Sequence, residues 1–242
     1  MKMKVLHVFL LMTLALVVLG VLSFRGASGQ ESGGAATAST QNSPPDIRPD
    51  SLSRMPRPHV EDMMTDEDKE SFKRVLSWEK VLNDPSGELG PTGTRAWIPQ
   101  LAEEYRKLGN MVHKANNLDP KYIELISLVA IREANIPAEW GGHAVNGRKL
   151  LGAKAVAIVQ NEDDPNVLED KKAALIIRFG RELFHETKVS SSTFAEMNEA
   201  FGWRGTLDIT LLMGYYDQNG ILYRAFDQHR APNEKEGQYP PW

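Results

Sequence analysis

The residues best suited to chemistry in this sequence are a glutamate and a histidine four positions apart in the segment PAEWGGH. If the segment is helical, Glu139 and His143 lie on the same face and their side chains can touch. A histidine beside a carboxylate can take and return a proton near neutral pH, as general acid–base catalysis requires. An ion pair on a solvated helix surface has the same spacing, so the spacing alone leaves both interpretations open.

Two glycines, Gly141 and Gly142, separate these residues. In a helix interior each glycine costs about 1 kcal/mol relative to alanine, and a solvated surface gains nothing from it. A helix face that must leave room for a ligand or a crossing helix does gain from the missing side chains. The glycines therefore favour a substrate pocket or a closely approaching helix beside His143. Trp140 could form one wall of such a pocket, although a helical tryptophan is more often part of the core.

A second glutamate, Glu124, occupies the apolar face of the preceding predicted helix. It is flanked by Ile123 and Leu125, and Leu128 and Ile131 follow one and two turns later. Burial raises the pKa of a carboxyl group unless a cation or hydrogen-bond donors compensate. Glu124 is therefore predicted either to donate a proton or to pair with a histidine. The alternative is a surface glutamate that the dipole favours near a helix start.

Helical patterns account for most of the chain after residue 60, and no clear run alternates apolar and polar residues as a strand would. The sequence thus predicts an all-α fold. Thr65 and Asp68 form a possible capping pair, and Asp119 before Pro120 is a typical helix start. Asn219-Gly220 is a strong turn signal inside the last pattern. The expected helices cover residues 69–82, 98–116, 120–134, 137–151, 170–186, 192–201 and 206–226, with a loop over 84–95.

Composition limits the partners and the chemistry. A chain of 242 residues predicts one ordinary domain with appendages. The net charge of -4 gives no basic excess to neutralise phosphates, so nucleic acid is not an expected partner. The absence of cysteine excludes disulfides, lipoprotein attachment and a thiolate nucleophile.

The N-terminus has the features of an export signal. Lys2 and Lys4 precede an apolar run over residues 5–24, and small residues at 27–29 offer a cleavage site. The protein is therefore expected in the periplasm or the medium. It contacts a membrane only if the apolar run stays as an uncleaved anchor. The predicted domains are a signal peptide or anchor at 1–29, a disordered linker at 30–59, a folded domain at 60–232 and a C-terminal tail at 233–242.

An ordered spacing connects these residues to a known family. Thiol peroxidases of the alkylhydroperoxidase-D-like type carry a glutamate, eleven residues, a cysteine, two residues, a second cysteine, three residues and a histidine. In this chain Glu124, Ile136, Glu139 and His143 stand at those positions. The chain resembles the carboxymuconolactone decarboxylase family, to which those peroxidases are related, and Glu139-Trp140 before His143 is typical of the branch without cysteines.

The resemblance covers roughly residues 53–232, including the segments SRMPRP, LGPTGTRAWIPQLAE and MGYYDQNGILYRAFD. It implies an alkylhydroperoxidase-D-like bundle of about six or more helices, with Asn219-Gly220 inside a continuing helix. It also implies a homotrimer, or a hexamer built from trimers, with sites near the subunit contacts. Peroxide reduction needs a thiolate, so peroxidase activity is excluded for a chain without cysteine.

The decarboxylase branch implies a reaction that needs neither metal nor organic cofactor. An unsaturated lactone loses CO₂, and an acid protonates the carbon skeleton. In this chain His143 would carry the proton, Glu124 would orient or charge it, and Glu139 would act as a second acid or base. Trp97 and the pair Tyr215-Tyr216 are candidates to line the same cavity, with core packing as the alternative for each.

Three interpretations stay open. The first is an exported, cofactor-free enzyme acting on a small lactone or an unsaturated carboxylic acid. The second is a zinc or manganese site formed by Glu124, Glu139 and His143. The third is a non-catalytic small-molecule-binding or assembly protein on the same scaffold, since fold does not fix function. Four other histidines lack a partner in the sequence and are predicted to be ordinary surface or core residues: His59, His113, His185 and His229.

Overall fold

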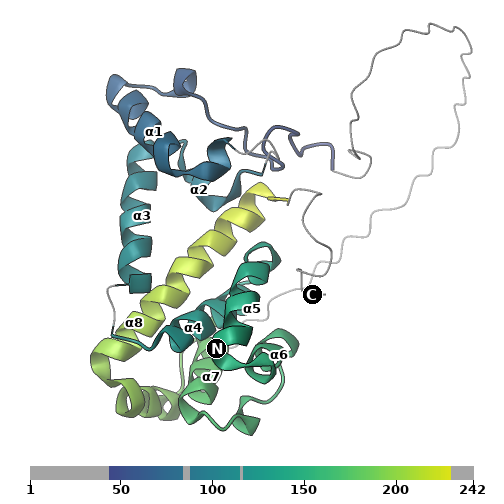
Figure 1. Cartoon of the computed structure of the whole chain (residues 1–242), viewed down its shortest axis with the longest axis vertical. Helices are drawn as coiled ribbons and strands as arrows, with labels where there is room; N and C mark the ends of the chain where they lie inside the picture. The colour runs from purple at the N-terminus through teal and green to yellow at the C-terminus, as the bar shows by residue number, and fades with distance from the viewer. Residues whose placement is uncertain (1–43, 84–87, 115–116, 230–242) are drawn as a thin grey trace, which may run out of the picture. The chain divides into compact units, whose positions relative to one another are not determined.

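The computed structural model describes residues 44–83, 88–114 and 117–229, which belong to the second of two units of the chain, Thr40–Trp242. These residues form an all-helical fold, as the sequence predicts, and in this part of the chain extended pairing is limited to an isolated bridge (Figure 1). The eight α-helices of the described residues are α1 (Asp66–Trp78), α2 (Gly90–Arg95), α3 (Pro99–Lys114), α4 (Pro120–Glu133), α5 (Pro137–Leu151), α6 (Ala153–Asn161), α7 (Lys171–His185) and α8 (Ser191–Phe226).

Several helix ends are set by the residues that the sequence marks as caps. At the start of α1 the Thr65 hydroxyl accepts a hydrogen bond from the Asp68 N–H, and the Asp68 carboxylate accepts one from the Thr65 N–H. The Asp119 carboxylate accepts a backbone N–H in the first turn of α4. Gly152 ends α5 with a φ of 85°, a backbone conformation that favours glycine. These signals explain why the predictions of α4 and α5 are confirmed. The first predicted helix is present as α1, but it begins at Asp66 and ends at Trp78 instead of covering residues 69–82.

Two helices differ from the sequence prediction. The segment 84–95, predicted as a loop, contains the short helix α2. Its glycines permit close packing, because a Cβ on Gly93 would lie 2.5 Å from a Leu89 side-chain carbon. Helix α6 was not expected either, although its buried residues follow helical spacing: Ala155, Val156, Ile158 and Val159.

Helix α8 joins two segments that the sequence predicts separately. A break at Gly202, with φ 68° and ψ 174°, marks the junction. Asn219 and Gly220 lie inside α8, as the family resemblance implies and against the local turn signal. Both are buried, and a Cβ on Gly220 would lie 3.1 Å from the Ile136 side chain. Close packing on the residue before α5 thus outweighs the local turn preference.

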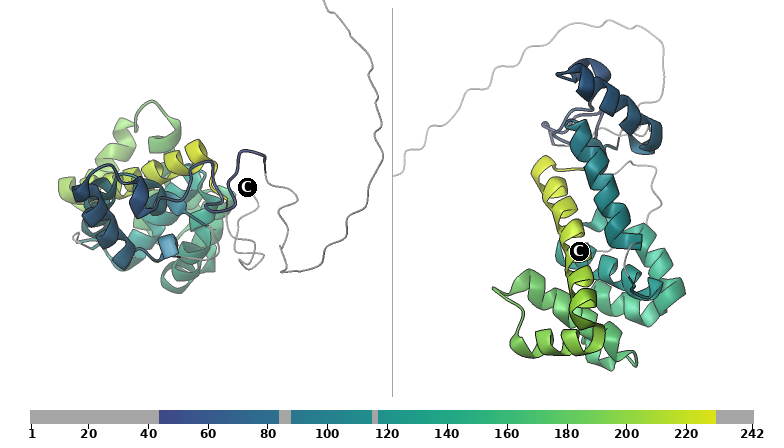
Figure 2. Two further views of the ribbon diagram at one scale, coloured as in Figure 1. Left: turned by 90° about the horizontal axis from the view of Figure 1, so that it is seen from above. Right: turned by 90° about the vertical axis from the view of Figure 1, so that its left-hand side faces the viewer.

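Helix α4 runs through the main hydrophobic core. Its residues 125–131 are all buried, and it packs against α5, α7 and α8. The views in Figure 2 show α8 running along the helices that it contacts, which include α3 and α4. This packing brings side chains from α3, α4, α5 and α8 within reach of one another, although they are far apart in the sequence.

A smaller core joins α1, α2 and α3, with Phe72, Val75 and Leu89 among its fully buried side chains. Helix α3 also packs on α8, where the Tyr105 ring stacks on Tyr215 with the ring centroids 5.0 Å apart. The contact links the α1–α3 segment to the main core.

The segment before α1 packs on the helices over the residues that the structure describes. Ser51 and Ser53 are fully buried, and the Arg54 N–H donates to the carbonyl of Phe226 at the end of α8. The predicted linker is therefore too long, and the prediction is wrong for residues 44–59. Composition did not reveal this, because backbone hydrogen bonds and small buried hydroxyls hold the segment in place.

Other domain predictions lie outside the described residues. They are the signal peptide or anchor at 1–29, the first part of the linker at 30–43 and the tail at 233–242. Within the ranges that the structure describes, no helix combines the length and the apolar character that a membrane span requires.

Candidate functional site

Glu124 and His143 form a direct hydrogen bond between two packed helices. Glu124 lies near the start of α4 and His143 in the middle of α5. The Nδ1 atom of His143 lies 2.9 Å from the Oε2 atom of Glu124. Their side chains are 25% and 19% exposed, so water shields this contact less than it would a surface pair. The predicted pairing of Glu124 with a histidine is therefore present.

The hydrogen bonding continues beyond His143 to a second histidine. The Nε2 atom of His143 lies 3.0 Å from the Tyr216 hydroxyl, which lies 3.0 Å from the Nε2 atom of His113. The Nδ1 atom of His113 lies 2.7 Å from the carbonyl oxygen of Gly109. Side chains from α4, α5, α8 and α3 thus form one hydrogen-bonded series, here called the polar chain: Glu124, His143, Tyr216 and His113.

Protons can be assigned along the polar chain from its fixed end. The Gly109 carbonyl can only accept, so Nδ1 of His113 carries a proton. Burial lowers the pKa of His113, so the ring is neutral at pH 7 and its Nε2 atom accepts. Burial also raises the pKa of Tyr216, which keeps its hydroxyl proton. Tyr216 therefore donates to His113, and its oxygen accepts from His143.

The same assignment fixes the number of protons at the Glu124–His143 end of the polar chain. Because Nε2 of His143 donates to Tyr216, one further proton must lie between Nδ1 of His143 and the carboxylate of Glu124. The pair is then either an imidazolium with a carboxylate, or a neutral imidazole with a protonated Glu124. Moving this proton requires only a transfer across one hydrogen bond. The geometry therefore places a transferable proton at the Glu124–His143 contact.

Glu139 has a different hydrogen-bond partner. Its Oε1 atom accepts from the Asn219 amide at 3.1 Å, and the Asn219 oxygen accepts from Nη2 of Arg95 at 2.7 Å. Both ring nitrogens of His143 are already used by other residues of the polar chain. The expected Glu139–His143 hydrogen bond is therefore not formed, because Asn219 offers Glu139 a buried donor.

Glu139 and His143 nevertheless line the same hollow, here called the His143 hollow. Its volume is about 470 Å³, and it is shallow and open to solvent. A Cβ built on Gly142 would meet no atom within 4 Å, so this glycine faces open space. Gly141 is half-buried. The other residues that line the hollow are Ala138, Asn146 and Tyr223.

Three predicted lining residues lie elsewhere. Trp140 is 2% exposed and belongs to the main core, because one helical step turns it away from the face of Glu139. The Trp97 indole N–H donates to the carbonyl of Pro56 at 2.8 Å. Tyr215 lines a second hollow. The prediction that these aromatic residues line the His143 hollow is wrong.

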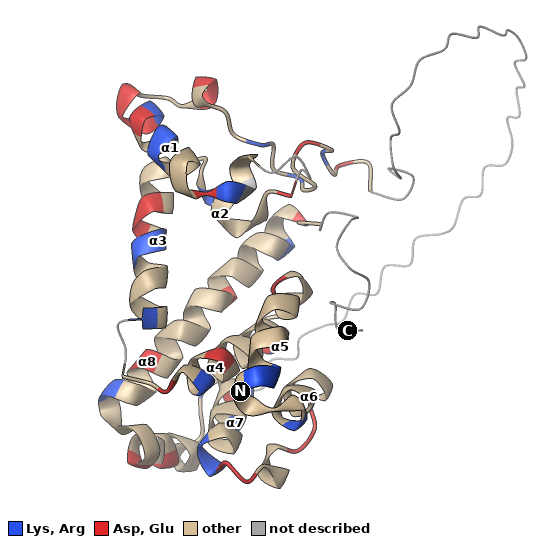
Figure 3. Ribbon diagram, viewed as in Figure 1, with Lys and Arg blue, Asp and Glu red and all other residues tan. Residues whose placement is uncertain are grey.

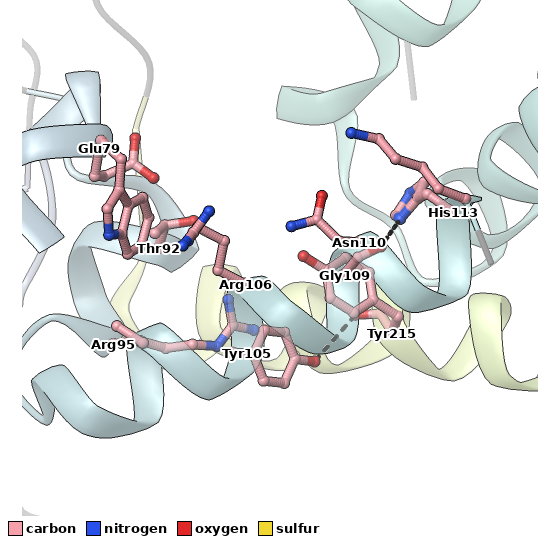
Figure 4. Close-up of a pocket in the computed structure, with 12 residues that line it drawn as sticks. Glu79, Thr92, Arg95, Tyr105, Arg106, Gly109, Asn110, His113 and Tyr215 are labelled. Carbon is pink, nitrogen blue, oxygen red and sulfur yellow. Dashed lines mark hydrogen bonds between the residues drawn. The ribbon is translucent and has the colours of Figure 1, made fainter.

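The second hollow, here called the Arg95 hollow, lies between α1, α2, α3 and α8 and has a volume of about 370 Å³ (Figure 4). Arg95, Tyr105 and Tyr215 line it, and so does His113. His113 therefore belongs both to this lining and to the polar chain.

Sequence reasoning missed His113 and Arg95 as site residues. His113 was predicted to be an ordinary histidine, yet it follows Tyr105 and Gly109 at helical spacing on the inward face of α3. That spacing could have suggested a buried imidazole. Arg95 gave no comparable signal, because its segment was predicted to be a loop.

The predicted metal site finds no matching geometry. In residues 44–83, 88–114 and 117–229, no group of three or more His, Asp or Glu side chains is placed to hold a metal ion. The Glu139 carboxylate accepts from Asn219, and that of Glu124 is paired with His143.

Comparisons with known proteins identify no relative of this chain. No protein-family model matches the chain, and no curated protein or solved structure matches it significantly. The functional argument therefore rests on the geometry of the site and on the spacing of its residues.

Proposed function

We propose that this protein is an enzyme that uses the Glu124–His143 pair for acid–base catalysis on a small lactone or an unsaturated carboxylic acid, without a cofactor. The observation that carries the proposal is the 2.9 Å contact between Nδ1 of His143 and Oε2 of Glu124. The contact holds a transferable proton, and His143 also lines a hollow of about 470 Å³. The resemblance of residues 124–143 to the cysteine-free branch of the carboxymuconolactone decarboxylase family supports the same function.

The reaction needs a proton at one carbon atom. When a carboxylate leaves as CO₂, the bond to the ring carbon breaks and its electron pair enters the conjugated lactone. The carbon skeleton must then take up a proton. The Glu124–His143 pair supplies this proton, and solvent restores it before the next turnover. Glu139 lines the same hollow and is placed to act as a second acid or base.

The proton leaves through the other ring nitrogen of His143. Because Nε2 is bonded to Tyr216, a substrate atom takes the Nε2 proton by replacing the tyrosine hydroxyl. The proton held at the Glu124 contact then stays on Nδ1, so the ring is left as a neutral imidazole. The open space beside Gly142, one residue before His143, gives room for the approach. Catalysis therefore includes a small displacement of Tyr216 or of the His143 ring.

The hydrogen bonding of His143 also favours a second candidate function. Both ring nitrogens of His143 already have partners within the protein, as they would in a network that serves packing alone. The second candidate is a small-molecule-binding or assembly protein on the same scaffold, without catalysis.

A homotrimer, or a hexamer of trimers, is part of the proposal. Helix α3 exposes Leu101, Leu108 and Met111, and their spacing places them on one face. A row of exposed apolar side chains is typical of a surface that contacts another protein. The second copy of the chain is the partner that the family resemblance implies.

The proposal also places the enzyme outside the cytoplasm, in the periplasm or the medium. The support is the N-terminal sequence, in which Lys2 and Lys4 precede the apolar run at 5–24. If the run is not cleaved, the protein is anchored to the membrane at its N-terminus.

The test is a screen of small unsaturated lactones and unsaturated carboxylic acids with the purified protein, followed by CO₂ release and by loss of conjugated absorbance. We expect turnover of at least one compound, with a rate about 10²- to 10⁴-fold lower in His143→Ala. His185→Ala is the matched control, because His185 also pairs with a glutamate, Glu133, at 2.7 Å. Binding of these compounds without turnover would favour the second candidate.

A further inference from the structure

Arg95 is a buried cation with no carboxylate ion pair in the described part of the chain. The residue is 7% exposed. Its Nη2 atom donates to the Asn219 oxygen, and its guanidinium lies over the Tyr105 ring, 3.7 Å from the ring centroid. The Asn219 amide in turn donates to Glu139. Burying an arginine in this way costs several kcal/mol unless an anion compensates, so a bound anion would recover part of that cost.

The walls beside Arg95 are flat and aromatic. Trp78, Tyr105 and Tyr215 line the Arg95 hollow, and Figure 4 shows the Arg95 side chain extending to the Tyr105 ring. The Tyr105 and Tyr215 rings are nearly parallel, with an interplanar angle of 20°. Because Arg95 and Tyr215 already cover the Tyr105 ring, these aromatic walls contact a flat apolar group through ring edges. A volume of about 370 Å³ is enough for a molecule with one ring.

The charged residues of the lining favour an anion. Arg106 and Lys114 join Arg95 in lining the hollow, and Glu79 is the carboxylate among the lining residues. The Arg106 guanidinium lies over the Trp78 ring, 4.6 Å from its centroid. Basic residues on α2 and α3 are visible in Figure 3. Three cations against one carboxylate give the hollow an excess of positive charge.

We propose that the Arg95 hollow binds a small aromatic monocarboxylate. The carboxylate pairs with the Arg95 guanidinium, whose planar fork can donate two parallel hydrogen bonds. The ring lies against Tyr105 and Tyr215. The site is separate from the His143 hollow, and its existence does not depend on the reaction proposed there.

Isothermal titration calorimetry with benzoate tests this site in the purified protein. We expect saturable binding with one benzoate per chain. Benzamide has the same shape without the charge and should bind about tenfold more weakly or worse. Inorganic phosphate has charge without a ring, and its binding should be weaker than that of benzoate by a similar factor. Equal affinities for benzoate and benzamide, or no saturable benzoate binding up to about 20 mM, would overturn the proposal.

Two variants locate the binding. Arg95→Gln removes the charge and should weaken benzoate binding by about tenfold or more. Asn110→Phe fills the hollow from an exposed position on α3, leaves Arg95 in place and should block benzoate. Arg148→Gln, at an exposed arginine on α5, is the control and should bind benzoate normally. Wild-type affinity in Asn110→Phe would overturn the proposal, even if Arg95→Gln failed to fold.

Discussion

The Nδ1 atom of His143 lies 2.9 Å from the Oε2 atom of Glu124, although 19 positions separate the two residues. The packing of α4 on α5 creates this contact. The Tyr216 hydroxyl accepts the other ring proton of His143, so the contact itself holds one proton that can move. A carboxylate and an imidazole arranged in this way can act as an acid and then as a base without a metal ion.

Replacing Tyr216 with phenylalanine tests the proton assignment along the polar chain. The change removes the hydroxyl that binds Nε2–H of His143 and the Nε2 lone pair of His113. Tyr216 is only 3% exposed, so water does not readily replace the lost hydroxyl. We expect Tyr216→Phe to lower the free energy of unfolding by about 1–3 kcal/mol, measured by urea denaturation at pH 7. Unchanged stability would show that the hydroxyl is not a required link.

Gly142→Leu tests whether the open space beside His143 is the substrate site. A leucine there meets no atom at its Cβ position and is a better helix former than glycine. The fold should therefore be unchanged or more stable by up to about 1 kcal/mol. Turnover should be lost, because the side chain fills the His143 hollow. Retained turnover would place the substrate elsewhere, and unfolding would show that Gly142 serves helix packing.

Gly147→Leu on the same helix is the matched control. A Cβ on Gly147 would lie 2.6 Å from Cδ1 of Leu128 and 3.1 Å from Cγ2 of Val156. We expect this variant to be destabilised by about 1–3 kcal/mol, as is usual for an overpacked core. Thermal denaturation of the two glycine variants side by side separates a glycine that serves packing from one that leaves open space.

Local sequence signals predicted much of the fold because many helix ends depend on neighbouring residues. The Asp119 cap and the Gly152 end require only nearby backbone atoms, and both are present. Asn219-Gly220 shows the limit of such signals. Its place inside α8 depends on packing against Ile136, which is distant in the sequence.

The candidate site was predictable only in part, because some of its contacts join residues that are far apart in the sequence. Glu124 and His143 could be chosen because each has a chemical type and a position on a helix face that suggests a partner. The partner of Glu139 could not be chosen, because Asn219 reaches it from the far end of the chain. Arg95 meets Asn219 through packing of α2 on α8, which no local pattern encodes.

Glu103 should make the fold sensitive to acid. Hydrogen bonds from Arg74 and Ser71 lower the pKa of Glu103 from its ordinary value of 4.5 to about 2. A carboxyl whose pKa is lower in the folded state stabilises the fold above its unfolded pKa. The contribution is lost as the pH falls from about 4.5 to about 2.

The measurement is urea denaturation of wild type and Glu103→Gln. At pH 7 the variant should be less stable by about 1–2 kcal/mol, an amount reduced because Arg74 is largely exposed to solvent. At pH 3 the difference should be smaller. A difference that stays constant or grows at pH 3 would contradict the assigned role of the Arg74–Glu103 pair.

Assembly can be tested through the exposed apolar side chains of α3. We expect light scattering of the purified protein to give a trimer or a hexamer at micromolar concentration. Met111, which is 62% exposed, should lie in the interface, so Met111→Glu should shift the protein toward the monomer while the helical content stays the same. A wild-type monomer at that concentration would rule out the proposed assembly.

The most direct test of the central claim is a double-mutant cycle on Glu124 and His143, measured as kcat/KM for a substrate found in the screen. The account predicts that His143→Ala loses about 10²- to 10⁴-fold and that Glu124→Gln also slows the reaction. Because the two residues act as one proton-holding unit, the double variant should be no slower than His143→Ala alone. A wild-type rate in His143→Ala, or losses that multiply in the double variant, would contradict the account.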